Sequence, residues 1–206
     1  AFFYTSMRWY INQITNILFA LIMLAVELVG VVSGILAIIL LYRNNILTWP
    51  VGFLNIICFV FLFYTEKLIG DLVVQFIFLG VGIYGWVNWN RKSDQLPSQL
   101  GIKTNILIAF LTLAMLPLTV KLLNLYFVCS YPLPEAIILN LSITGQILTS
   151  KHKLESWLYW IVADILMSIV YGLKGLELTM IYAIIGTVLG FMGYFNWKSL
   201  IRNKMQ

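Results

Sequence analysis

The sequence GWVNW runs from Gly85 to Trp89, and GYFNW runs from Gly193 to Trp197, 108 residues further on. Other identities keep this spacing without a gap, so the chain contains two copies of one unit of roughly 65 residues. Because both copies lie in very hydrophobic sequence, the repeat is typical of a transporter, whose substrate site usually lies between the repeats near the bilayer midplane. The other matched pairs are Glu27 with Glu135, Trp49 with Trp157, and Gly82 with Gly190.

The composition indicates a polytopic α-helical membrane protein. Of 206 residues, 61% are hydrophobic and 10% are charged, whereas a soluble domain carries about 25% charged residues. Apolar runs near the ~20 residues that cross a bilayer recur along the chain, and the polar intervals between them are short. The net charge of +5 points neither to nucleic acid nor to an acidic substrate. No cleavable signal peptide is expected.

The predicted architecture is three membrane helices, one linker helix, and three more helices. The linker helix restores the chain direction, so the two bundles should be parallel and related by an axis along the membrane normal. Pro117 should bend the linker helix. The seven predicted helices are 19–41, 46–64, 70–90, 104–124, 133–150, 154–172 and 176–198. The predicted units are an interfacial segment 1–18, a first bundle 19–90, the linker helix 104–124 and a second bundle 133–198.

The distribution of Lys and Arg predicts the orientation in the membrane. Nine basic residues fall on one predicted side and four on the other, which places the first side in the cytoplasm. The N-terminus is then outside and the C-terminus is cytoplasmic. The nine are Arg43, Arg91, Lys92, Lys103, Lys151, Lys153, Lys198, Arg202 and Lys204, and the four are Arg8, Lys67, Lys121 and Lys174.

The predicted sixth helix has the most informative face. Trp157, Trp160, Asp164 and Tyr171 fall at i, i+3, i+7 and i+14, on one side of the helix. An intramembrane carboxylate is costly and indicates a functional site by default. An aromatic wall beside a carboxylate suits a flat ring, and a cationic ring gains further from an indole face. The alternative is an interfacial tryptophan pair with an aspartate bonded to another helix.

Further candidates for substrate binding come from the matched positions of the repeat. Asn55 sits one position from the counterpart of Asp164, although an interhelical hydrogen bond is an equal alternative. Gln75 and Tyr182 lie one repeat position apart and are expected to face a central cavity, and the second bundle is the more polar. The complete predicted substrate-binding set is Trp49, Asn55, Gln75, Asn140, Trp157, Trp160, Asp164 and Tyr182.

Several absences limit the chemistry. No Lys or Arg lies in the middle of a predicted span, and phosphate esters are normally met by these residues, so a phosphorylated substrate is not expected. An integral-membrane enzyme is not expected either, because no His cluster, Ser/His arrangement or metal-spaced carboxylates occur at membrane depth. No cofactor or metal is predicted. Asn88 and Asn196 are expected to cap or join helices, and His152 is given no role.

The motifs taken together resemble the PnuC vitamin-transporter family over essentially the whole chain. Two departures are Val74, where the family usually has Leu, and Ile69, where it has Tyr. The first bundle contributes Trp49-Pro50-x-Gly52, Gly70-Asp71-x3-Gln75 and Gly85-Trp86-x2-Trp89. The second bundle contributes Glu155-x-Trp157-x2-Trp160-x3-Asp164, Thr179-x2-Tyr182 and Gly193-x3-Trp197.

The resemblance implies a SWEET-like facilitator in a bacterial inner membrane that works by alternating access without energy coupling. It implies nicotinamide riboside, an NAD precursor, as substrate, with thiamine or riboflavin carried by other branches and trapping of the riboside by a separate kinase. Homotrimers occur in some members. Two alternatives are proton-coupled uptake through Asp164 and a binding receptor without transport. The expected surroundings are the lipid bilayer and the small-molecule substrate, with no nucleic acid.

Overall fold

The computed structural model describes residues 2–65, 67, 69–91, 96–126 and 131–204. Within this part the chain forms eight helices and one isolated β-bridge, between Ser98 and Lys153, which confirms the predicted all-helical fold. The helices are α1 (Phe2–Tyr42), α2 (Thr48–Thr65), α3 (Ile69–Asn90), α4 (Ile102–Ala114), α5 (Leu116–Tyr126), α6 (Pro132–Ser150), α7 (Ser156–Leu173) and α8 (Glu177–Lys204).

The predicted linker helix is interrupted next to its proline, Pro117. α4 ends at Ala114 and α5 begins at Leu116, directly before Pro117. Proline has no backbone N–H and its ring clashes with the carbonyl four residues earlier, so one continuous helix cannot pass this point without distortion. The prediction that Pro117 disturbs the linker is therefore confirmed, and the seven predicted helices correspond to the eight observed ones with the linker in two parts.

Most of these helices have the length and hydropathy of membrane spans. Six segments of the described helices qualify: Gln13–Tyr42, Thr48–Thr65, Asp71–Asn90, Ile102–Tyr126, Ser156–Leu173 and Glu177–Asn203. The remaining helix, α6, is 19 residues long but more polar, and it packs between α3 and α7 inside the bundle. Its neighbours, rather than lipid, can therefore satisfy its polar side chains.

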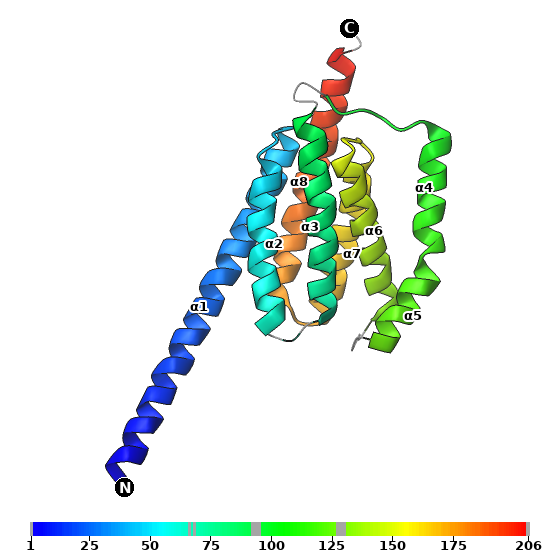
Figure 1. Ribbon diagram of the computed structural model, residues 1–206. Coiled ribbons are helices and arrows are strands. Elements are labelled where there is room, and N and C mark those ends of the chain that lie inside the picture. Colours follow the sequence, from blue (N-terminus) through cyan, green and yellow to red (C-terminus); the bar gives the residue numbers. More distant parts are fainter. Residues whose placement is uncertain (1, 66, 68, 92–95, 127–130, 205–206) are drawn as a thin grey trace.

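The start of the first helix was predicted wrongly. It was expected at residue 19, but α1 begins at Phe2 and runs for 41 residues. Residues 2–29 contain neither proline nor glycine, so nothing in this segment ends a helix. At 1.5 Å per residue α1 is about 60 Å long, roughly twice the hydrocarbon thickness of a bilayer, and it projects well beyond the other helices (Figure 1). The interfacial placement of residues 1–18 stays a prediction.

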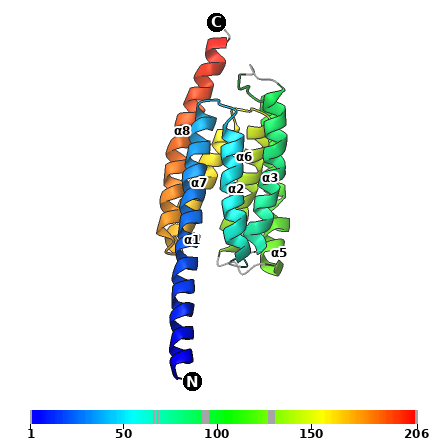
Figure 2. The ribbon, with the colours of Figure 1, turned by 60° about the vertical axis from the view of Figure 1, so that its left-hand side comes forward.

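Six helices form a closed ring. α1 packs on α2, α2 on α3, α3 on α6, α6 on α7, α7 on α8, and α8 returns to α1, while α4 and α5 pack against α6 from outside. α1, α3, α6 and α8 run in one direction, α2 and α7 run in the other, and the two termini lie at opposite ends of the molecule (Figures 1 and 2). The interior of this ring is the natural place for a passage across the membrane.

The two halves of the ring are joined by a matched pair of tryptophan hydrogen bonds. Trp89 Nε1 on α3 donates to the Thr149 carbonyl on α6 at 3.2 Å. Trp197 Nε1 on α8 donates to the Leu41 carbonyl on α1 at 3.1 Å. Donor and acceptor in the second bond each lie 108 residues from the corresponding residue of the first. The same indole-to-carbonyl hydrogen bond thus forms at both joints of the ring, the contact of α3 with α6 and the contact of α8 with α1.

Two asparagines next to these tryptophans make a second matched pair. Asn88 Nδ2 donates to the Ser150 carbonyl at 2.9 Å, and Asn196 Nδ2 donates to the Tyr42 carbonyl at 2.7 Å. Each bond satisfies a carbonyl in the last turn of a helix, where no intrahelical donor is available. The prediction that Asn88 and Asn196 join helices is confirmed.

Candidate functional site

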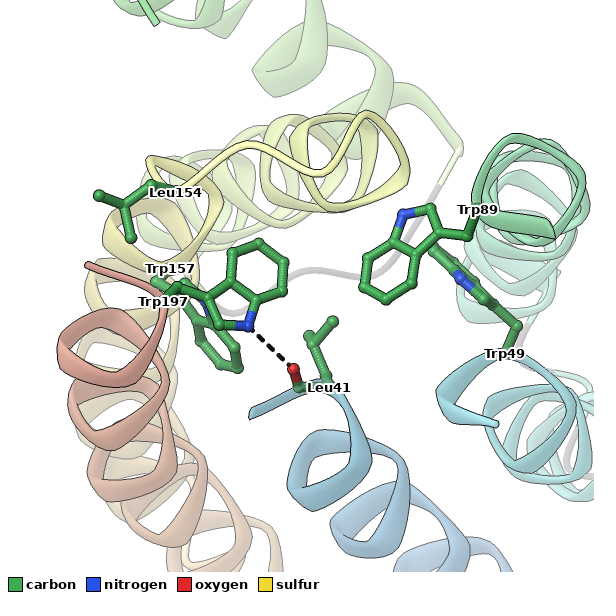
Figure 3. Close-up of a cluster of buried hydrophobic side chains, with 6 residues drawn as sticks. All are labelled: Leu41, Trp49, Trp89, Leu154, Trp157 and Trp197. Atoms are coloured by element: carbon green, nitrogen blue, oxygen red, sulfur yellow. Dashed lines mark hydrogen bonds between the residues drawn. The ribbon is translucent and has the colours of Figure 1, made fainter. Parts of the chain in front are cut away.

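Four tryptophans, which we call the tryptophan cluster, fill one end of the ring: Trp49, Trp89, Trp157 and Trp197. All are at least 95% buried. Trp49 meets Trp89 edge to face at 5.6 Å, and Trp157 meets Trp197 in the same way at 5.4 Å. The two pairs come from opposite sides of the ring (Figure 3) and approach each other through Trp89 and Trp197 at 6.0 Å. This end of the ring, the cluster end, is closed in the structure.

Two of the predicted ligand residues belong to this cluster. Trp49 and Trp157 are 5% and 1% exposed, so neither presents a free indole face in this conformation. Glycines on the neighbouring helices make their packing possible, since a Cβ atom at Gly85 would overlap Trp49 and one at Gly193 would overlap Trp157. Among the described residues, neither indole N–H has a hydrogen-bond partner. Their surroundings are those of packing residues.

His152, for which no role is predicted from the sequence, completes the cluster end. Its ring stacks on Trp89 at 3.9 Å and 13°, and meets Trp197 edge to face at 5.1 Å. Its Nε2 donates a hydrogen bond to Oδ1 of Asn44. Burial, with a smaller effect of Lys153, lowers the pKa of His152 to about 4, so the imidazole is neutral at pH 7. The missed signal was the spacing: Asn44 and His152 are repeat counterparts.

Three polar candidates come together further along the ring, between α1, α2, α7 and α8. Asn55 Nδ2 and the Tyr182 hydroxyl each lie 2.8 Å from the position that a Cβ atom of Gly34 would occupy. Asn55 Nδ2 donates to the Gly30 carbonyl at 2.8 Å. Because Gly34 has no side chain, the Asn55 amide and the Tyr182 phenol can both lie against the backbone of α1 at this residue.

Asp164 on α7 joins this polar group. Its side chain is 9% exposed, and its Oδ2 would lie 2.5 Å from a Cβ atom at Gly186 on α8. Tyr182, one turn before Gly186, interacts electrostatically with Asp164. The structure thus brings Asn55, Asp164 and Tyr182 to one part of the ring, and their role in substrate binding stays a prediction. Among the described residues, no group of three or more His, Cys, Asp or Glu side chains has an arrangement that could hold a metal ion.

Trp160 lies one turn before Asp164 on α7 and is only half-buried. Its Nε1 donates to the Thr149 hydroxyl at 3.2 Å. Its indole packs on the backbone of α6 at Gly145, where a Cβ atom would come within 3.2 Å. Across the ring, the Phe78 ring of α3 faces it edge to face at 6.3 Å. Trp160 and Phe78 therefore form an aromatic pair between the two bundles.

Gln75 belongs to the same side of α3 as Phe78. It lies three residues before Phe78, a spacing that puts both on one face of a helix, and it is half-buried. Phe78 itself was missing from the predicted set, because its sequence reads as one more apolar residue of a membrane helix. Only the position of α3 opposite α7 makes it a neighbour of Trp160.

Asn140 is the predicted residue that the structure places elsewhere. Its Nδ2 donates to the Thr112 carbonyl at 3.4 Å, and its Oδ1 accepts from the Thr119 hydroxyl at 2.9 Å. Thr144, one turn further along α6, meets the Thr112 hydroxyl at 3.0 Å. The polar face of α6 is therefore satisfied by the linker helices α4 and α5, and Asn140 does not meet Asn55 or Asp164.

Comparisons with known proteins place this architecture in a family. A family model described as nicotinamide mononucleotide transporter matches residues 24–199. The chain is 24% identical over 209 residues to the nicotinamide riboside transporter PnuC of Escherichia coli (strain K12), with 87% of each chain covered. It is 26% identical over 167 residues to the riboflavin/roseoflavin transporter RibM of Streptomyces davaonensis, with 77% of each covered.

A solved structure supports the same assignment at the level of the fold. The crystal structure of the vitamin B3 transporter PnuC superimposes with a TM-score of 0.72 at 18% sequence identity, and the match covers 85% of this chain and 81% of that one. Since the family model covers most of the chain and the helices have the character of membrane spans, this chain belongs to the PnuC family of multi-pass membrane transporters.

Proposed function

We propose that this chain carries nicotinamide riboside across a bacterial inner membrane by facilitated diffusion. One observation carries the proposal: the aromatic pair of Trp160 and Phe78 lies close to a buried carboxylate, that of Asp164. Nicotinamide riboside has a cationic aromatic ring, a carboxamide and ribose hydroxyls. The ring suits an indole face, and the hydroxyl and amide donors suit a carboxylate and the Asn55 and Tyr182 side chains.

Charge supports an unphosphorylated substrate. The described neighbours of Asp164 and Trp160 include Gly186, Gly145, Phe78 and Thr149, and none of these is Lys or Arg. A phosphate dianion brought to this place would lose its hydration without gaining a basic partner, which is costly. The nucleoside, and not its phosphate ester, is therefore the substrate we assign. The PnuC relatives are named as riboside transporters, whereas the matching family model is named after the mononucleotide.

The repeat supplies the transport mechanism. We infer two parallel three-helix bundles, and the paired bonds of Trp89 and Trp197, 108 residues apart, support this relation. With the C-terminus in the cytoplasm, the tryptophan cluster closes the cytoplasmic end of the ring. Transport then requires this end to open while the other end closes, with the bundles rocking about the site between them. A homotrimer, implied by the resemblance, stays a prediction.

Riboflavin transport is the second candidate, because RibM matches 77% of the chain. It has less support, since its relative covers a smaller part of the chain than the PnuC of E. coli does.

Titration calorimetry and proteoliposome uptake test the proposal together. The purified protein is titrated with nicotinamide riboside, thiamine, riboflavin and nicotinamide mononucleotide, and uptake of each binding ligand is then measured. We expect saturable binding and uptake of the riboside, with the mononucleotide bound at least tenfold more weakly. Equal affinity for the mononucleotide contradicts the charge argument. Riboflavin uptake without riboside uptake favours the second candidate, and binding without uptake indicates a receptor.

A further inference from the structure

Thr149 accepts hydrogen bonds from two tryptophans that belong to different parts of the molecule. Its hydroxyl accepts from Trp160 Nε1 at 3.2 Å, and its backbone carbonyl accepts from Trp89 Nε1 at 3.2 Å. Thr149 lies in the last turn of α6 and is 3% exposed. One residue thus links the indole that faces the candidate site with an indole of the tryptophan cluster.

The link continues from Trp89 to the turn between α6 and α7, and from there to the turn between α1 and α2. Trp89 stacks on His152 at 3.9 Å, and His152 hydrogen-bonds to Asn44 in the turn between α1 and α2. Four contacts therefore lead from Trp160 through Thr149, Trp89 and His152 to Asn44. Each contact is buried or partly buried, where hydrogen bonds and ring contacts are not weakened by competition with water.

The first bundle has no such link at the corresponding place. The counterpart of Thr149 is Leu41, whose carbonyl accepts from Trp197 but which has no hydroxyl. The counterpart of Trp160 is Gly52, which has no indole. The two joints of the ring are therefore alike in their backbone bonds, but only the joint at Thr149 is connected to the candidate site.

We propose that Thr149 is a positioning residue that transmits the state of Trp160 to the tryptophan cluster, so that a ligand stacked on Trp160 changes the closure of the cluster end. The link itself is a property of the ligand-free protein, and only its use in transport rests on the proposed function. Coupling of this kind is reciprocal. A change at Trp160 must therefore alter the environment of Trp89, and a change at Trp89 must alter that of Trp160.

A double-mutant cycle in the ligand-free protein tests the link. The seven tryptophans are replaced biosynthetically by 5-fluorotryptophan, and the Trp89 and Trp49 fluorine signals are assigned by single Trp→Phe substitutions. We expect Trp160→Phe to shift the Trp89 signal in the wild type and to leave it unmoved in a Thr149→Val background, since valine keeps the shape and the carbonyl but lacks the hydroxyl. Thr149→Ser should restore the response, and Thr149→Ala replaces the valine variant if that variant does not fold.

Transport measurements test the use of the link. In proteoliposomes exchanging labelled nicotinamide riboside, Thr149→Val should lower the maximal rate about 3- to 30-fold, the range expected for a lost coupling contact. The half-saturation concentration should change by less than about twofold, because Thr149 acts through Trp160 and not on the ligand. Thr149→Ser should recover most of the rate.

Thr48→Val is the matched control. Thr48 is also a buried threonine at the cluster end, and its hydroxyl donates to the Ala37 carbonyl at 2.9 Å. The proposal is overturned if Trp160→Phe leaves the Trp89 signal of the otherwise wild-type protein unmoved. It is also overturned if Thr48→Val and Thr149→Val lose the same amount of rate. A wild type that transports no riboside overturns the proposed function alone, because the fluorine cycle still decides the link.

Discussion

Asn44 and His152 hydrogen-bond to each other although they are the same position in the two copies of the repeat, 108 residues apart. Both adopt the left-handed backbone conformation, with φ of 57° and 59°. A residue meets its own counterpart in this way only near the axis that relates two copies. The pair therefore lies close to the axis we infer for the two bundles, in the turns that must separate if the cluster end opens.

The protonation of His152 should control the stability of the cluster end. Its pKa in the folded protein, about 4, is below the usual 6.5, so folding favours the neutral ring. This contribution is complete above pH 6.5 and is lost as the pH falls from 6.5 to 4, with a total of about 2–4 kcal/mol. The melting temperature of the wild type should therefore fall more between pH 7.5 and 4.5 than that of His152→Gln. Parallel pH profiles for the two proteins would show that other groups cause the acid sensitivity.

Because Trp157 packs closely on Gly193, we expect one added methyl group at Gly193 to lower the stability of the protein. Gly193→Ala should destabilise the protein by about 1–3 kcal/mol, because the new Cβ overlaps an indole that cannot move within a filled cluster. Gly80→Ala is the matched control, since the new Cβ would meet nothing within 4 Å beyond its chain neighbours and the backbone of its own helix, and alanine favours a helix by up to about 1 kcal/mol. Denaturation in mild detergent measures both. Equal stability of the two variants contradicts the packing argument.

The sequence predicted the helices well because hydropathy and proline placement are local signals. It did not predict the contacts of α6, because a polar helix face shows that partners exist but not which helix supplies them. Asn140 was therefore assigned to the substrate site, whereas its partners are Thr112 and Thr119 of the linker helices. The linker belongs to neither copy of the repeat, so the repeat contained no information about this interface.

The repeat and the helical period together predict Asp164 and Tyr182 as site residues, and in the structure the two interact electrostatically. Their role in binding stays a prediction. His152 lies between Lys151 and Lys153 in the sequence, and these basic neighbours indicate only a polar turn. The contact with its counterpart Asn44 depends on the two bundles meeting face to face, which only the assembled ring shows.

The aromatic pair predicts how ligand affinity responds at Trp160. Trp160→Ala should weaken riboside binding about 2- to 30-fold, in line with about 0.5–2 kcal/mol for a cation on an indole, and Trp160→Phe should weaken it less. Trp86→Ala is the control, because Trp86 is an exposed tryptophan on α3 that packs on Phe53. Calorimetry on folded protein gives the affinities. Unchanged affinity in both Trp160 variants would leave Trp160 as a packing residue.

The basic residues predict the orientation of the bundle. Lys204 ends α8, seven residues after Trp197 of the tryptophan cluster, at the end of the molecule that the nine-to-four distribution places in the cytoplasm. A Lys204→Cys variant, with Cys58 and Cys129 replaced by alanine, should react with an impermeant thiol reagent only after the membrane is opened. Reaction in intact cells would reverse the topology and would move the cluster to the outer side.

The role of Asp164 decides between facilitated diffusion and proton coupling. A proton carrier must gain and lose its charge in every transport cycle, which requires alternating contact with water on the two sides. Asp164 is instead held against α8 at Gly186 and beside Tyr182, where it can accept hydrogen bonds from a ligand or balance a pyridinium charge. Asparagine keeps the shape and much of the hydrogen-bonding capacity but removes the charge.

Asp164→Asn should therefore weaken riboside binding roughly 10- to 150-fold, the loss expected for a hydrogen bond to a charged group, while downhill exchange continues in proteoliposomes. Asp71→Asn, which changes an exposed carboxylate in the first turn of α3, should bind and exchange like the wild type. An imposed pH gradient should not concentrate the riboside in wild-type vesicles, because no group needs to change its charge during the cycle. Accumulation that is driven by protons and abolished in Asp164→Asn would instead establish Asp164 as the proton carrier and this chain as a symporter.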